Sequence, residues 1–460
     1  MGRSGQILAS LLLFALPLLA TTSWSHEENE PRDREREVRE DRHEAREDRR
    51  VREKDDRRDR ETRADNSGSG SVESDNSGPG SENSGSDDRD AERRGRDDDR
   101  GRGSSWRFEV ERDSAGHERV RREVLMVADR ASIDTVRNAG FSIIAERPLT
   151  AFNETLARIQ VRPGRSVEQV ISELQALAPL ASIAPHHLFR PSGDDVAAPA
   201  AETVVQPAPT PVANGGHVGV IDTGADISWP ALTRSIVQTE GFADGGYTSR
   251  THGTLVSEIV ARSGARLTVA DVFGVDADNR LIAPAAAIAS AIDWLVENRV
   301  RVINISIEGP DNVVLAHVIK RALAADVAIV AAAGNGGPGA APAFPAAYPG
   351  VIAVTAVDEN GQVYRRANRG DYIAFAARGV HVASEYESTS AKTAKTISGT
   401  SFASPVVAAE IARRLDVAAG IQEVIASLRG EARDLGAPGR DSTYGWGELD
   451  VPAALTASSR

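Results

Sequence analysis

The chain contains no cysteine in 460 residues, which excludes disulfide scaffolds, cysteine-ligated zinc and thiol catalysis. It also lacks an excess of basic charge, because 54 Lys and Arg residues stand against 67 Asp and Glu residues, for a formal net charge of −13. That balance argues against a generally basic nucleic-acid-binding protein, and we expect no nucleic-acid partner.

The beginning of the chain has the pattern of a targeting segment. Arg3 precedes an apolar run over residues 7–20, and a short stretch rich in small residues follows it. The run is shorter than the roughly 20 residues that a membrane-spanning helix needs, and Pro17 interrupts it. We therefore predict a signal peptide over residues 1–25 and export to a secreted, periplasmic or extracellular location, without stable membrane insertion. An uncleaved membrane anchor is the less favoured alternative.

Residues 26–105 have no aromatic side chain and carry 20 basic and 27 acidic residues. Such a segment has too little apolar surface to offset the entropy lost on folding, so we predict a disordered, charged and Ser/Gly-rich arm. An Asp-Asn-Ser-Gly sequence occurs at 65–68 and again at 75–78, but without the spacing of a calcium-binding loop. A flexible spacer is the favoured interpretation, and the rest of the chain is nearly balanced in charge.

Residues 106–190 predict a small α+β domain. Apolar runs and helical spacing follow the order β-α-β-β-α-β, which is typical of a ferredoxin-like fold, with the last strand expected over Leu180–Ala184. His186 and His187 have no ligand partner nearby in the sequence, so we expect a solvated pair and no metal site. Residues 191–211 are rich in Pro and Ala and are interpreted as a linker.

Residues 212–455 alternate between buried strands and helices. His217–Ile221 and Val300–Ile305 are apolar runs typical of buried strands, and Ala283–Glu297 is expected to be a helix. Regular alternation of this kind indicates a parallel sheet with helices on both faces. The fold class is therefore α/β, in one domain of catalytic size.

Four short motifs in this domain carry polar residues where a strand ends or a helix begins. Taken singly, each motif has an ordinary structural explanation, such as a turn or a helix cap. Together they supply an acid, a base, an amide donor and a nucleophile, in the chain order Asp, His, Asn, Ser. The residues are Asp222 in VGVIDTG, His252 in THGT, Asn335 in AAGN and Ser401 in SGTSFASP.

With these four motifs in order, residues 212–455 resemble the subtilisin-like serine proteases, or subtilases. The resemblance implies that Ser401 attacks the scissile carbonyl, that His252 is the general base and that Asp222 orients the His252 ring. It further implies that the Asn335 side chain and the Ser401 N–H stabilise the oxyanion. The expected activity is therefore that of a secreted serine endopeptidase that hydrolyses peptide bonds through an acyl-enzyme.

The resemblance also places the substrate groove. The expected substrate-binding residues form two groups, one along an edge that pairs with an extended peptide and one along the opposite wall: Ser306, Ile307, Glu308 and Gly309, then Ala332, Ala333 and Gly334. Glu308 stands where glycine is common in the family. We hypothesise that its carboxylate favours a basic residue in the substrate.

By the same resemblance, residues 106–190 are similar to an inhibitory propeptide that assists folding. We expect autocleavage between about Phe189 and the linker, with protein or peptide substrates and the propeptide itself as partners, and a monomer. Structural calcium is a family expectation for which no ligand set is identified; no other cofactor is expected. The alternative is a catalytically silent, peptide-binding or regulatory module. A serine esterase is disfavoured because Ala403 breaks the G-x-S-x-G elbow, and a metalloprotease because H-E-x-x-H is missing.

Overall fold

The structure is a computed structural model that describes residues 107–192, 215–384, 386, 395–415, 420–449 and 451. All of them belong to one unit of the chain, Asp99–Arg460. The expected signal peptide (1–25), the charged arm (26–105) and nearly all of the expected linker (193–211) lie outside the described residues, as do residues 452–455. We call residues 107–192 the N-terminal domain and residues 215–451 the C-terminal domain.

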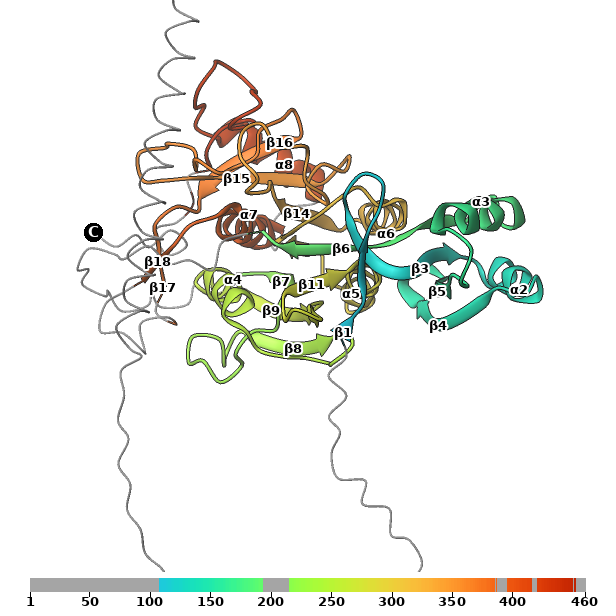
Figure 1. The fold of residues 1–460 in the computed structure, drawn as a ribbon. Helices are drawn as coiled ribbons and strands as arrows, with labels where there is room; N and C mark the ends of the chain where they lie inside the picture. Colours follow the sequence, from blue (N-terminus) through green and yellow to red (C-terminus); the bar gives the residue numbers. More distant parts are fainter. Residues whose placement is uncertain are drawn as a thin grey trace, which may run out of the picture. The chain divides into compact units, whose positions relative to one another are not determined.

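The N-terminal domain is built on antiparallel strands in the order β6-β3-β5-β4, with two helices on one face (Figure 1). This is the order of a ferredoxin-like sheet, as the sequence predicted. Its elements are β1 (Arg107–Phe108), β2 (Val110–Arg112), β3 (Glu118–Ala128), α2 (Arg130–Asn138), β4 (Ser142–Leu149), the 3₁₀ helix η1 (Thr150–Phe152), β5 (Glu154–Gln160), α3 (Val167–Leu177) and β6 (Ser182–Pro191).

The C-terminal domain contains a seven-stranded parallel sheet in the order β16-β15-β14-β12-β7-β9-β8. Its strands are β7 (His217–Asp222), β8 (Ile236–Gly241), β9 (Arg266–Asp271), β12 (Val302–Ile305), β14 (Ala328–Ala332), β15 (Ile352–Val357) and β16 (Ile373–Arg378). Shorter strands lie outside this sheet: β10 (Gly274–Asp276), β11 (Leu281–Pro284), β13 (Ile307–Glu308), β17 (Val382–Ser384) and β18 (Lys395–Ile397). The helices are α4 (Thr251–Ala261), α5 (Ala285–Glu297), α6 (Val313–Ala324), α7 (Thr400–Leu415) and α8 (Ile421–Glu431).

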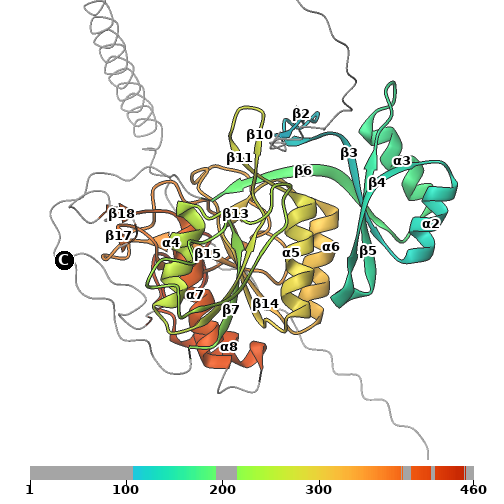
Figure 2. The same cartoon turned by 90° about the horizontal axis from the view of Figure 1, so that it is seen from below.

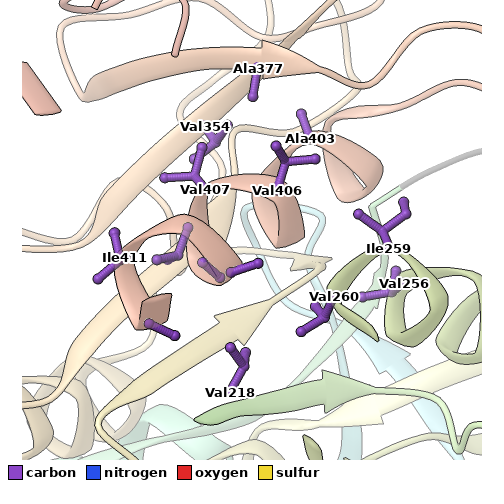
Figure 3. Packing of buried hydrophobic residues seen from close by; sticks show 14 of the residues in the cluster. Val218, Val256, Ile259, Val260, Val354, Ala377, Ala403, Val406, Val407 and Ile411 are labelled. Atoms are coloured by element: carbon purple, nitrogen blue, oxygen red, sulfur yellow. The ribbon is translucent and has the colours of Figure 1, made fainter. Parts of the chain in front are cut away.

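Both faces of the parallel sheet are covered by helices, which explains why its strands, apart from the more exposed edge strand β8, are largely apolar without alternation. On one face, α4, α7 and α8 form a buried cluster in which Val256, Val406 and Ile411 pack toward strand residues such as Val218 and Val354 (Figure 3). On the other face, α5 and α6 pack in a second cluster that also takes in apolar residues of β3, β5 and β6 (Figure 2). The expected α/β fold with helices on both faces is confirmed.

The order of the parallel strands reverses at β7. This strand lies between β9 and β12, and the chain leaves it in one direction for β8 and β9 and later returns on the other side through β12. In open α/β sheets, ligands bind beyond the carboxyl ends of strands at such a reversal. Asp222, the last residue of β7, and Ser306, directly after β12, both stand at this edge.

Several element boundaries differ from the sequence prediction, and two of these differences have a structural cause. The expected helix Ala283–Glu297 begins at Ala285, because residues Leu281–Pro284 form β11, and Pro284 serves as the N-cap of α5. The expected strand Leu180–Ala184 instead runs from Ser182 to Pro191 as β6, since its second half pairs with β11 and β13 of the C-terminal domain. A pairing partner distant in the sequence is invisible to local periodicity.

Within the described part of the chain, every helix is too short or too polar to span a bilayer.

Candidate active site

Asp222, His252 and Ser401 are brought together from β7, α4 and α7. The Nδ1 atom of His252 lies 2.8 Å from Oδ1 and 3.0 Å from Oδ2 of Asp222, and its Nε2 atom lies 3.2 Å from Oγ of Ser401. The three side chains are buried, with Asp222 and Ser401 fully so. This arrangement fixes the Nδ1–H tautomer of His252 and leaves Nε2 free to accept the Ser401 proton.

The beginning of α4 approaches the end of β7 so closely that only glycine fits between them. A Cβ atom on Gly253 would lie 1.9 Å from the carbonyl oxygen of Thr223. The Gly253 N–H donates to Oγ1 of Thr223 at 2.8 Å, and the Thr223 N–H donates to Asp222 at 2.6 Å. The residues next to the acid and the base therefore hold the two segments in register.

Ser401 is the second residue of α7, where backbone N–H groups have no intrahelical acceptor. Pro405 lies four residues further on and has no N–H to donate to the Ser401 carbonyl. The Ser306 hydroxyl donates to that carbonyl instead, at 3.1 Å, and the Asn304 amide donates to Ser306 at 2.9 Å. Because Pro405 leaves the Ser401 carbonyl without a helical donor, the Ser306 hydroxyl binds it and ties α7 to the end of β12.

Asn335 lies beside the same helix start. Its Oδ1 atom accepts from the Thr400 N–H at 3.1 Å and from the Thr400 hydroxyl at 3.2 Å, so its Nδ2 group points the other way. That Nδ2 group lies 3.3 Å from the hydroxyl of Ser192. The preceding Gly334 has φ of +106°, a conformation that favours glycine. Asn335 therefore presents two N–H donors to whatever group occupies the cleft.

The segment in the cleft is the end of the N-terminal domain. β6 lies between β11 and β13 and is antiparallel to both, with Pro191 opposite Ile307 and Arg190 opposite Glu308 (Figure 2). One residue further, the Ser192 N–H donates to the Ser306 carbonyl at 3.1 Å. Ser192 is fully buried. The chain thus lies as an added strand along the edge that the sequence assigned to substrate.

Glu308 is directed toward Ser192 and away from the arginine opposite it. One carboxylate oxygen accepts from the Ser192 hydroxyl at 3.2 Å and from the Asn335 N–H at 2.8 Å. The Arg190 side chain instead donates to the Leu281 carbonyl at 3.1 Å and pairs with Glu118. Burial raises the pKa of Glu308 above its usual range, against the opposing effect of these hydrogen bonds.

The other expected substrate-binding residues divide into two groups. Ile307 pairs with β6, and Gly309 lies against the Phe189 ring, where a Cβ atom would approach that ring to 2.3 Å. Ala332, Ala333 and Gly334 are buried and lead into Asn335. Strand pairing and hydrogen bonds join this second group to Val354, Asn368, Tyr372 and Thr400.

Two residues of the site were not identified from the sequence. Ser192 was assigned to a linker because Pro and Ala dominate the residues that follow it. Asp271 ends β9 beside Asp222 and accepts from the Thr248 and Phe273 N–H groups; burial raises its pKa to about 6. An acid at the end of an apolar strand was the signal available for Asp271, the same signal that identified Asp222.

The expected solvated histidine pair is wrong, because β6 carries both residues into the domain interface. His186 is 1% exposed, its Nδ1 atom lies 2.9 Å from Glu123, and its Nε2 atom accepts from the Ala286 N–H at 3.4 Å. His187 is 6% exposed and lies between Asp113 and Asn312. Among the described residues, Asp113, His117 and His187 are the one group whose ligand atoms lie close enough to share a metal ion.

Comparison with known proteins places the C-terminal domain in a family. Residues 213–447 match the model of the subtilase family. Over 258 residues, the chain is 34% identical to subtilisin DY of Bacillus licheniformis. The aligned region covers 52% of this chain and 89% of subtilisin DY. Over 259 residues, the chain is 30% identical to the minor extracellular protease Epr of Bacillus subtilis. The aligned region covers 53% of this chain and only 39% of that protease.

A solved structure extends the likeness to the fold. The crystal structure of fervidolysin from Fervidobacterium pennivorans, a keratinolytic enzyme related to subtilisin, matches with a TM-score of 0.59 at 19% identity. The match covers 76% of this chain and 63% of that one. At that identity the likeness concerns the fold alone. The family model and the match with subtilisin DY lead to one conclusion: this chain belongs to the subtilase family of serine endopeptidases.

Proposed function

We propose that the chain is an exported serine endopeptidase made as a zymogen, and that its first substrate is its own Ser192–Gly193 bond. The observation that carries this proposal is the position of Ser192, whose N–H is bound by the Ser306 carbonyl while its side chain meets Asn335 and Glu308. The residue is held by both backbone and side chain, and its hydroxyl also lies 3.3 Å from that of Thr400, the residue before Ser401.

The chemistry follows from the arrangement of the triad. Ser401 Oγ attacks the Ser192 carbonyl carbon while His252 Nε2 takes the hydroxyl proton, and Asp222 stabilises the resulting imidazolium. His252 then gives the proton to the amide nitrogen of Gly193 as the C–N bond breaks, which leaves Ser192 esterified to Ser401. Water, deprotonated by His252, hydrolyses the ester and restores Ser401.

Negative charge on the carbonyl oxygen requires donors that are in place before the reaction. The Asn335 Nδ2 group and the Ser401 N–H at the start of α7 are the proposed donors. Thr400 holds the Asn335 amide oxygen with two hydrogen bonds, so the Nδ2 group does not have to be oriented when the charge develops. Losing one such donor typically costs ~3 kcal/mol of transition-state stabilisation.

Inhibition before release follows from how firmly the N-terminal domain is held. Its η1 N–H groups donate to Asp293 at 3.0 Å each, and Glu154 contacts His317 at 2.9 Å. Phe189 is fully buried in the apolar cluster shared by the two domains. A cut after Ser192 leaves these contacts intact, so the cleaved domain remains in the groove until it is displaced.

We infer that Glu308 sets the preference at the residue whose carbonyl is attacked. Its carboxylate faces the Ser192 hydroxyl, so it favours a side chain that donates a hydrogen bond or carries positive charge at that place. This sharpens the hypothesis of a basic preference to one position, since Arg190 is directed elsewhere. Export is the accompanying proposal, supported by the pattern of residues 1–25 and by the extracellular relative.

The deciding experiment compares the wild-type chain with Ser401→Ala and, as a matched control, with Ser427→Ala on the exposed side of α8. Mass spectrometry and N-terminal sequencing should find a new N-terminus at Gly193 in the wild type and the control, and none in Ser401→Ala. A fluorophosphonate probe should label only the two chains that keep Ser401. Equal processing in all three would remove autocatalysis, and a wild-type chain that is neither processed nor labelled would favour a catalytically silent, peptide-binding module.

A further inference from the structure

Asp113, His117 and His187 converge at one end of the N-terminal domain, away from the triad. One carboxylate oxygen of Asp113, Oδ2, lies 3.3 Å from Nε2 of His187 and 3.5 Å from Nδ1 of His117. All three ligand atoms lie within 4.8 Å of one another, and the two rings meet edge to face with centroids 5.9 Å apart. Nothing in the proposed peptidase mechanism uses this group.

The separations suit a tetrahedral ion better than a pair of hydrogen bonds. An N–H···O bond is usually about 2.7–3.2 Å long, so both contacts are longer than this range. Zinc binds imidazole nitrogen and carboxylate oxygen at roughly 2.0–2.2 Å, and the edges of that tetrahedron measure about 3.3–3.5 Å. Two of the three edges are therefore already present, and a small movement of the exposed His117 ring closes the third.

The carboxylate is oriented for this role. The other oxygen of Asp113, Oδ1, accepts from the backbone N–H groups of Ala115 and His117, both at 2.9 Å, which directs Oδ2 at the two rings. His117 is exposed and His187 is buried, so an ion reaches the group from solvent and keeps one water ligand. The nearest cation, Arg119, pairs with Glu111 and Glu168, which offset its charge.

The far side of His187 connects this group to the C-terminal domain. Asn312, the N-cap of α6, accepts two backbone N–H groups with Oδ1, so Nδ2 is the atom that faces His187 Nδ1 at 3.2 Å. In the docked domain, His187 Nδ1 is therefore an acceptor, and the ring proton is on Nε2. A metal bound to Nε2 requires the ring proton to be on Nδ1. The Nδ1–H group would then face the Nδ2–H donor of Asn312, and no hydrogen bond could form between them.

We propose that Asp113, His117 and His187 form a zinc site in the N-terminal domain, and that zinc binding opposes the Asn312–His187 contact that helps to dock this domain. Coupling of this kind is reciprocal: zinc weakens docking to the extent that docking weakens zinc binding. The site is independent of peptidase activity, so it is tested in the Ser401→Ala chain.

The first test measures Zn²⁺ binding to the full Ser401→Ala chain by calorimetry and by the visible absorption of tetrahedral Co²⁺. His117→Gln and Asp113→Asn should each weaken binding at least tenfold and remove the tetrahedral spectrum. His381→Asn, at an exposed histidine outside the site, should change neither. Ca²⁺ should not compete, because imidazole is not one of its preferred ligands. Equal zinc affinity in the parent and both ligand variants would overturn the site.

The second test addresses the coupling, again in the Ser401→Ala chain. Asn312→Asp keeps a good N-cap and replaces the donor by an acceptor for Nδ1–H, so zinc should bind about tenfold tighter or more. Asn312→Ser keeps a cap without adding charge and should also tighten binding, which separates the tautomer effect from simple attraction to a carboxylate. Unchanged or weaker binding in Asn312→Ser would show that docking and zinc binding are not opposed.

Discussion

The two domains meet at one cleft but contribute to it in different ways. In the C-terminal domain, the triad and Asn335 stand at strand ends and helix starts that the parallel sheet fixes. The hydrogen bonds that join the triad lie within that domain, and Asn335 also contacts Ser192. The N-terminal domain instead reaches the cleft through one strand, β6. It docks through contacts with titratable side chains, such as that of its His186 with the Ala286 N–H and that of its η1 N–H groups with Asp293 of the C-terminal domain.

The difference separates chemistry from docking. Changes inside the triad should abolish turnover while leaving the N-terminal domain in place, because the hydrogen bonds that join the three side chains lie within the C-terminal domain. Changes in β6 or in the interface residues should free the N-terminal domain while leaving the triad geometry intact. A substitution that does both would show that the two regions are coupled.

The largest expected effect comes from Asp222→Asn. An amide at this position donates to His252 Nδ1, which moves the ring proton to Nε2 and removes the acceptor for Ser401. The rate of processing at Ser192 should fall by about 10⁴-fold, measured as the half-time of cleavage in purified chain. Asp226→Asn, at a partly buried acid four residues on that caps a turn, is the control and should process at nearly the wild-type rate.

A smaller effect, confined to docking, is expected for Phe189→Ala in the Ser401→Ala chain. Phe189 is fully buried against Gly309, and truncating a buried Phe typically costs about 3–5 kcal/mol. The free energy of unfolding of the N-terminal domain, measured with urea, should fall by that amount. The free energy of unfolding of the C-terminal domain should not change. Leu180→Ala, which alters a side chain that is 96% exposed, should have no measurable effect. An equal shift in both variants would contradict the role of Phe189.

Glu308→Gln should alter selectivity more than rate. The amide keeps the shape of the side chain but loses its charge, so the preference for Lys or Arg over an apolar residue should fall by about tenfold at the position of Ser192. A peptide library cleaved by processed enzyme gives the kcat/KM ratios. The same ratios in both enzymes would leave Glu308 without a role in selectivity.

The smallest expected effect is that of pH on docking. Burial lowers the pKa of His186 in spite of the attraction of Glu123, whose own pKa is held at about 2 by His186 and Arg158 against its burial. The Ala286 N–H directed at Nε2 agrees with a neutral ring. Because the unfolded histidine takes up a proton near pH 6.5 and the docked one does not, the free energy of unfolding should fall as the pH drops below about 6.5.

The measurement is urea unfolding of the Ser401→Ala chain at a series of pH values, compared with the same chain carrying His186→Gln. The difference between the two profiles isolates His186. Asp293 acts in the opposite sense, since burial raises its pKa to about 6 and the native state therefore gains protons as the pH falls through that value. Identical slopes in both chains would mean that His186 does not titrate on undocking.

Local sequence was enough for residues whose signal lies within a few positions. Asp222, His252 and Ser401 each follow or open an element with a recognisable pattern, and the order of the motifs identified their partners. The same local method predicted the end of β6 and the start of α5 too early, because no local feature at Ala184 or Ala283 indicates a pairing partner that is distant in the sequence. β6 and β11 pair across about a hundred residues of chain.

The sequence by itself therefore determined the class of fold and the three residues that we propose as the triad, because hydrophobic periodicity and short turn motifs are local properties. Only the tertiary structure decided that Ser192 lies beside Asn335 and Thr400, that Glu308 faces Ser192 rather than Arg190, and that His187 joins Asp113 and His117. Each of these depends on which distant strands pair and in what register. Register is set by the burial of whole faces and not by any single residue.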